Sequence, residues 1–251
     1  MNNNIPAVEK TLALLEMLSS EEKGLTQSQL KEKLHISMST CYRILQTLLA
    51  KEWVRKDENG VYHPGKALYP LFMGFRSSFL FPEGLLTILE QVSRKYEIGC
   101  KLSIRQGSFQ LTIYRSDPSG SEMTPAFSGK RASRFPVIEG SVGAVLLAEE
   151  TKENILLLAE NCETDIPEKT VPQLIFDRRD FLHKYGYCHN ENNRWHICAF
   201  SVPVKDSSGK TAAALTFILP RHDLDARTQK KYIMLLKETC EKCENMIKKG
   251  E

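Results

Sequence analysis

Residues 25–53 constrain this chain most, because they predict two helices joined by a tight turn. Thr26 and Gln29 have the three-residue spacing of a capping box, in which each side chain bonds the other residue's backbone amide. His35 and Ile36 form the predicted turn, and Ser37 is suited to cap the second helix. The stretch therefore predicts a helix-turn-helix.

The second of these helices has an apolar face and a polar face. Its apolar residues follow the spacing i, i+3, i+4, i+7 and are expected in the core: Cys41, Ile44, Leu45 and Leu48. The opposite face offers hydroxyl, guanidinium and amide groups without a carboxylate, a set that suits phosphate oxygens and base edges. A solvated helix face is the alternative interpretation. We predict DNA contacts from this helix and its cap, through Ser37, Ser39, Thr40, Tyr42, Arg43 and Gln46.

The flanking segments favour the DNA-binding interpretation. A helix is predicted over residues 6–20, with Val8, Leu12, Leu15 and Leu18 on its apolar side. Two β-prone runs surround Asn59-Gly60, which predicts a hairpin over residues 53–64. Three helices followed by a hairpin are the order of a winged helix-turn-helix. Arg55 and Lys56 at the wing are predicted to contact phosphates. We expect these contacts to be weak, because acidic residues lie beside them in the sequence.

Composition is compatible with this interpretation and excludes others. The 251 residues carry a net charge of +3, which permits a nucleic-acid partner without requiring one. No apolar run approaches the roughly 18 residues of a membrane span, and the first residues lack a signal-peptide pattern. Seven irregularly spaced cysteines indicate reduced thiols rather than a disulfide framework. We therefore expect a cytoplasmic protein without a membrane partner.

A segment rich in exposed apolar residues follows the wing. Residues 65–76 predict a helix that presents Leu68, Leu71, Phe72 and Phe75, which are too many apolar groups for a free linker. We expect it to pack on a second subunit or on the next domain. The predicted domains are residues 1–65, a linker helix over 66–81, and a second domain over 82–251.

The second domain mixes helices with antiparallel hairpins, which predicts an α+β fold. The predicted strands cover residues 100–104, 111–114, 196–204 and 210–219, with an edge strand near 123–127. The predicted helices cover residues 82–96, 144–148, 152–160, 172–185 and 225–248.

Both halves resemble the IclR-type bacterial transcriptional regulators. In the first half the resemblance lies in Ala7–Leu18, Leu25–Leu34, Ser39–Leu45 and Tyr62–Leu68. In the second half it lies in Gly140–Ala148, Tyr185–Tyr187 and Ile197–Gly209. It implies a regulator, not an enzyme, that binds a double-stranded DNA operator as a homodimer or dimer of dimers. It also implies a GAF-like C-terminal domain with an antiparallel sheet that binds a small-molecule effector, an organic acid or related metabolite.

The predicted effector site lies in this second domain. Glycines 140 and 143 flank an expected helix start, where backbone N–H groups suit a carboxylate, although a plain turn explains them equally. The resemblance implies pocket residues Ser141, Val142, Gly143, Asn190, Cys198 and Thr216. For Cys198, a small buried apolar residue of a strand is an equal alternative. Ile218 stands where the family often has a hydroxyl, so we expect a less polar pocket than a very small acid requires.

Three other chemistries are weaker. Cys188, His189, His196 and Cys198 are residue types that bind zinc, which leaves a metal- or redox-responsive regulator as the alternative function. Cys240 and Cys243 form a C-x-x-C pair, for which core packing or exposed thiols are the simpler interpretations. Cys198, His183 and Asp177 could form a nucleophile triad, but nothing in their spacing orders them. We therefore predict no metal, no cofactor and no catalytic activity.

Overall fold

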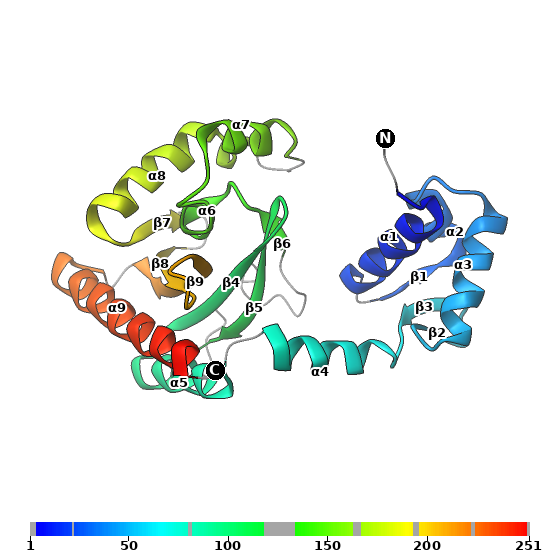
Figure 1. The fold of residues 1–251 in the computed structure, drawn as a ribbon, viewed down its shortest axis with the longest axis horizontal. Coiled ribbons are helices and arrows are strands. Elements are labelled where there is room, and N and C mark those ends of the chain that lie inside the picture. Colours follow the sequence, from blue (N-terminus) through cyan, green and yellow to red (C-terminus); the bar gives the residue numbers. More distant parts are fainter. Residues whose placement is uncertain are drawn as a thin grey trace. The chain divides into compact units, whose positions relative to one another are not determined.

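The computed structural model describes residues 4–21, 23–79, 82–117, 134–162, 167–192, 196–221 and 224–249. The chain divides into two compact units, Met1–Leu80 and Phe81–Glu251, and each has a hydrophobic core of its own (Figure 1).

The N-terminal unit is a winged helix-turn-helix, as predicted. Its sheet is antiparallel and has the order β1-β3-β2, and Gly60 takes a positive φ of 78° in the turn of the wing. The short strand β1 was not predicted; it pairs Leu25 with Tyr62 and so joins the helix-turn-helix to the wing. The elements are α1 (Pro6–Ser20), β1 (Leu25–Thr26), α2 (Gln27–Lys33), α3 (Met38–Ala50), β2 (Val54–Lys56), β3 (Val61–Pro64) and α4 (Leu68–Phe79).

The predicted capping of the two central helices is confirmed. The Thr26 hydroxyl accepts from the Gln29 amide, and the Gln29 side chain accepts from the Thr26 amide at 2.8 Å, which completes the capping box of α2. His35 takes a positive φ of 50° in the turn. Ser37 caps α3 by accepting from the Thr40 amide at 3.1 Å. These bonds fix where α3 begins, and therefore which of its residues face outward.

The apolar side predicted for α1 is wrong at two of its four positions. Val8 and Leu12 are 50% and 56% exposed, whereas the helix buries Leu14 and Leu18. Leu14 and Leu18 are one turn apart and enter the core that α2, α3 and β3 build. With Ile5, the two exposed residues form a second apolar stripe on α1 that the described part of this unit does not cover.

The C-terminal unit is an α+β domain around one antiparallel sheet, as predicted. The sheet has six strands in the order β6-β5-β4-β9-β8-β7. The elements are α5 (Glu83–Tyr96), β4 (Gly99–Gln106), β5 (Phe109–Ser116), β6 (Arg134–Pro136), α6 (Gly140–Leu146), α7 (Lys152–Glu160), the 3₁₀ turn η1 (Pro167–Lys169), α8 (Pro172–Tyr185), β7 (Cys188–Asn192), β8 (Ile197–Lys205), β9 (Thr211–Pro220) and α9 (Ala226–Lys249).

Helices cover both faces of this sheet (Figure 1). Alternate residues of β4, β8 and β9, such as Leu102, Phe200 and Phe217, pack with Leu89 of α5 and Leu236 of α9 in the main core. The residues between them face α6, which packs on the sheet together with α8. We call this second side the α6 face.

Most of the predicted elements of this unit match the structure, but two short strands, β6 and β7, are missing from the prediction. The helices predicted over 152–160 and 172–185 have the observed bounds, and Gly186 ends α8 in the left-handed conformation. Strand β7 was not predicted, because its sequence CHNEN has no apolar alternation. The edge strand predicted near 123–127 lies outside the described residues. Among the described helices, none is long and apolar enough to cross a membrane.

Gly143 is required for the packing of α6. A Cβ at this position would lie 2.0 Å from the carbonyl oxygen of Val137, a backbone atom that cannot swing away. We expect Gly143→Ala to destabilise the C-terminal unit by about 1–3 kcal/mol or more, measured by urea unfolding. Gly74→Ala is the matched control, because nothing lies within 4 Å of a Cβ there and alanine favours a helix. Equal stability of wild type and Gly143→Ala would contradict this packing.

Candidate DNA-binding and effector-binding sites

The outward face of α3 is polar and uncovered in the N-terminal unit. Cys41 and Leu45 are fully buried, while Ser39, Arg43 and Gln46 are exposed and Tyr42 is 51% exposed. Within the described residues, the Arg43 guanidinium forms no hydrogen bond or ion pair, so its five donors remain available. The helix therefore holds the predicted contact residues on one accessible side.

The hydroxyls at the start of α3 are linked to one another. Ser37 Oγ donates to Thr40 Oγ1 at 2.8 Å and lies 3.1 Å from Ser39 Oγ. Ser37 thus has a structural role as the cap, whereas Ser39 is an exposed hydroxyl that does not cap the helix. Of the six predicted residues, Ser39, Tyr42, Arg43 and Gln46 lie on the exposed face of α3, Thr40 is half-buried beside it, and Ser37 precedes the helix as its cap.

The wing presents its cations and turns one carboxylate inward. Arg55 and Lys56 are exposed on β2, and the Lys56 ammonium lies 5.4 Å from the centre of the Tyr62 ring. Asp57 accepts from the Val61 amide and lies 3.1 Å from His63 Nε2, which lowers the pKa of its carboxyl. The Asp57 carboxylate therefore stabilises the turn of the wing instead of pointing with Arg55.

A row of paired residues crosses the α6 face of the large sheet. Ser201 on β8 belongs to this row and forms hydrogen bonds of 2.9 Å with Ser141 of α6 and with Thr216 of β9. All three hydroxyls are at least 97% buried. From β7 to β5, the row consists of Cys188, Ser201, Thr216, Lys101 and Arg115.

The remaining predicted effector residues lie around this row in different ways. Asn190 is beside the start of α6, with its amide nitrogen 3.8 Å from the place a Gly140 Cβ would occupy. Its carbonyl oxygen accepts from Arg178 at 3.2 Å. Val142 is buried in the apolar cluster between α6 and α8, and Gly143 packs on the Val137 backbone.

The structure does not bring Cys198 to this group. Its side chain lies in the main core with α5 and α9, on the opposite side of the sheet from Ser201. Ala199, one residue later, pairs with Asn190 and Ile218 and so stands on the α6 face. Side chains alternate along a strand, so an error of one residue moves a side chain through the sheet.

Two more polar residues of β4 stand on the α6 face, and sequence reasoning missed both. Lys101 pairs with Thr216, and Ser103 pairs with Ala214. Burial, followed by repulsion from Arg115, lowers the pKa of Lys101 to about 8. Ser103 is 1% exposed, and its hydroxyl has no hydrogen-bond partner among the described residues. The pattern Lys-Leu-Ser-Ile was a usable signal, because it places polar side chains at i and i+2 of a buried strand.

The sequence matches two family descriptions that together span most of the chain. Residues 7–58 match the IclR helix-turn-helix domain. Residues 83–245 match the bacterial transcriptional regulator IclR C-terminal domain. The chain belongs to the IclR family. It is thus a transcriptional regulator with a DNA-binding helix-turn-helix and an effector-binding C-terminal domain, not an enzyme.

Solved structures of IclR proteins share the fold. An IclR transcriptional regulator from Alicyclobacillus acidocaldarius is 22% identical with a TM-score of 0.80, over 97% of this chain and 99% of that one. An IclR homologue from Microbacterium hydrocarbonoxydans, solved in complex with 4-hydroxybenzoate, is 17% identical with a TM-score of 0.76, over 96% and 99%. No curated protein matches the sequence.

The cysteines of this IclR protein are poor candidates for metal or redox chemistry. Cys188 faces α6 and Cys198 faces α9, so the two cannot share one ion. Among the described residues, no group of three or more Cys, His, Asp or Glu side chains could hold a metal. Burial raises the pKa of Cys188 to about 12 and of Cys198 to about 11, which suppresses the reactive thiolate. Cys240 and Cys243 are buried in the main core, as one of the two interpretations predicted.

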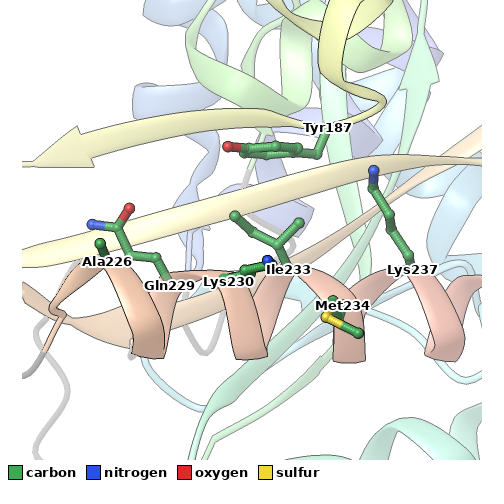
Figure 2. Close-up of a pocket in the computed structure, with 7 residues that line it drawn as sticks. All are labelled: Tyr187, Ala226, Gln229, Lys230, Ile233, Met234 and Lys237. Atoms are coloured by element: carbon green, nitrogen blue, oxygen red, sulfur yellow. The ribbon is translucent and has the colours of Figure 1, made fainter.

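Two open hollows lie on the surface of the C-terminal unit. One, of about 440 Å³, lies between α8 and β7 and includes Arg178 and Asn190. The other, of about 370 Å³, runs along α9 (Figure 2). There Lys237 rises toward Tyr187, with its ammonium 5.7 Å from the ring centre, and donates to the Tyr185 carbonyl at 2.8 Å. None of the predicted effector residues lines this second hollow.

The hydrogen bonds of Ser201 allow the stability of the α6 face to be tested. Ser201→Ala would remove the shared partner and leave the buried Ser141 and Thr216 hydroxyls without it, at a cost of about 1–3 kcal/mol in urea unfolding. Ser208→Ala, at an exposed turn, is the matched control and should change stability by less than about 0.5 kcal/mol. If both variants unfold alike, the hydrogen bonds of Ser201 do not contribute as described.

Proposed function

We propose that α3 binds the major groove of an operator, that two copies bind together, and that a small metabolite on the α6 face controls their affinity for DNA. This places the activity in the cytoplasm. The observation that carries the DNA part is the exposed polar face of α3, whose orientation is fixed by the Ser37 cap and the buried Cys41 and Leu45. A recognition helix presents side chains to base edges in this way.

Exposed apolar residues of the N-terminal unit support a dimer. On α4, Tyr69, Leu71 and Phe72 are 66%, 53% and 53% exposed. On α1, Val8 and Leu12 form the second apolar stripe. Apolar surface of this extent is typical of a protein interface. A dimer also holds two recognition helices at a fixed spacing, which a two-fold operator requires.

The α6 face supports an effector site in the second domain. On this face, the hydrogen-bonded hydroxyls of Ser141, Ser201 and Thr216 lie beside Lys101, under α6. Apolar residues at these positions would make the folded protein more stable. The Microbacterium homologue holds 4-hydroxybenzoate, and we infer an organic acid for this chain as well. Such a ligand changes the affinity for DNA only by the difference in its own affinity for the two arrangements of the dimer.

Arg43 tests the DNA-binding face. We expect Arg43→Ala to weaken binding by roughly 1–3 kcal/mol, because a bidentate guanidinium contact to a base would be lost. The measurement is fluorescence anisotropy with a duplex that the wild-type protein has selected from a random-sequence pool. Arg43→Lys keeps the charge and loses the planar fork, so it separates a base contact from a phosphate contact. Unchanged affinity of Arg43→Ala would refute the assignment of this face.

Phe72 tests the proposed dimer interface. A carboxylate buried between two subunits is costly, so Phe72→Glu should raise the dimer dissociation constant at least about tenfold in sedimentation equilibrium. Leu157→Glu is the matched control, since Leu157 is 57% exposed on α7 in the other unit. Equal dissociation constants for the two variants would remove α4 from the interface.

A further inference from the structure

The α6 face contains a buried donor that nothing in the described protein satisfies. Ser103 is 1% exposed, and its hydroxyl has no hydrogen-bond partner among the described residues. Leaving such a group unpaired costs about 1–3 kcal/mol, so most buried hydroxyls in folded proteins have partners. Ser103 lies between Ala214 of β9 and Thr112 of β5, and it shares its side of β4 with Lys101.

Lys101, two residues earlier on the same side of β4, adds a positive charge. The charged groups that act on it are Arg115 on β5 and Glu139 before α6. Arg115 Nε lies 2.7 Å from Asp117 Oδ2, and Glu139 lies 3.5 Å from the Lys169 ammonium, so each of these ions has an opposite partner. In the described ranges, no carboxylate forms an ion pair with the Lys101 ammonium.

The surroundings limit the size and charge of a ligand. Ala199 and Ile218 stand on the same face and offer apolar contact to the body of a ligand, while Ala214 packs against α6. Arg178 donates to Asn190 on β7. Strand β7 is three strands from β4, or about 14 Å, so this second cation is too far away to share a small ligand with Lys101. A small ligand on Lys101 therefore meets one unbalanced cation, which favours a single negative charge.

We propose that Lys101 and Ser103 bind the carboxylate of an organic monocarboxylate, with the ammonium as its counter-charge and the hydroxyl as a hydrogen-bond donor. This inference rests on the proposed effector function and names the chemical class of the ligand. It makes Lys101 the residue that selects acids over neutral analogues. A pair of this kind discriminates between ligands, because the wrong ligand leaves the charge of Lys101 and the buried hydroxyl of Ser103 unpaired.

The test uses the full chain and two matched sets of probes. The acids are benzoate, 4-hydroxybenzoate, phenylacetate and hexanoate, and their neutral counterparts are the four corresponding amides. We expect at least one acid to bind in calorimetry while its amide binds at least about tenfold more weakly. Lys101→Met should weaken that acid at least about tenfold, Ser103→Ala about threefold or more, and Lys101→Arg should remain within about threefold of wild type.

A pH profile distinguishes ligand binding from a structural role of Lys101. With a pKa of about 8 in the free protein, the ammonium is mostly protonated at pH 7 and mostly neutral at pH 9. The affinity of wild type for the acid should fall about tenfold over this range, and the affinity of Lys101→Arg should stay level. Thermal unfolding and operator binding of the unliganded variants serve as folding controls.

Three outcomes overturn the inference: no acid binds, the amides bind as tightly as the acids, or Lys101→Met binds the acid as wild type does. The proposed function fails separately. If an acid binds through Lys101 but leaves operator affinity unchanged, the site stands and the control of DNA binding by a metabolite does not.

Discussion

Burial of one side of an element decides what its other side can offer, and both functional surfaces of this protein depend on that constraint. In α3, the buried Leu45 fixes the direction in which Arg43 points. In β9, the buried Phe217 fixes the side of the sheet on which Thr216 stands. The hydrophobic effect thus positions polar groups that contribute little to it themselves.

The polar groups under α6 reduce the stability that an apolar interface would give. The three hydroxyls around Ser201 satisfy one another, so their net cost is small. Ser103 and Lys101 lack such compensation in the described chain, and burial disfavours the charged form of Lys101. Groups that lower stability in this way are typical of ligand sites, where the ligand supplies the missing partner.

Elements with a strong local signal could be predicted from the sequence, and those set by the tertiary structure could not. The capping box at Thr26 and the apolar spacing of α3 depend only on neighbouring residues, and both are confirmed. The exposure of Leu12 on α1 depends on which stripe meets the rest of the unit, and two stripes of similar hydropathy were available. Strand β7 forms because β8 offers it hydrogen bonds, not because of its own sequence.

The candidate effector residues show the same division. Ser141 and Thr216 came from a resemblance in short segments, and the structure brings them together through Ser201, which no local pattern indicated. Cys198 lies on the opposite side of the sheet. Side chains of a strand alternate between its two faces, so an error of one residue in the register assigns a side chain to the wrong face. Lys101 could not be assigned to the site from the sequence, because the alternation of β4 does not show which of its two faces packs against α6.

Strand β4 is the element through which a ligand on the α6 face could influence the rest of the chain. Lys101 and Ser103 stand on its ligand side, while Cys100 and Leu102 on its other side pack in one core with Leu85 and Leu89 of α5. Helix α5 is the first helix after α4 in the chain, so it is the part of the C-terminal unit that the DNA-binding unit is tethered to most directly. Close-packed interiors do not deform continuously. A ligand that favours one position of β4 would therefore favour one position of α5. The largest change in DNA affinity that the ligand can cause is set by the difference between its own affinities for the two positions.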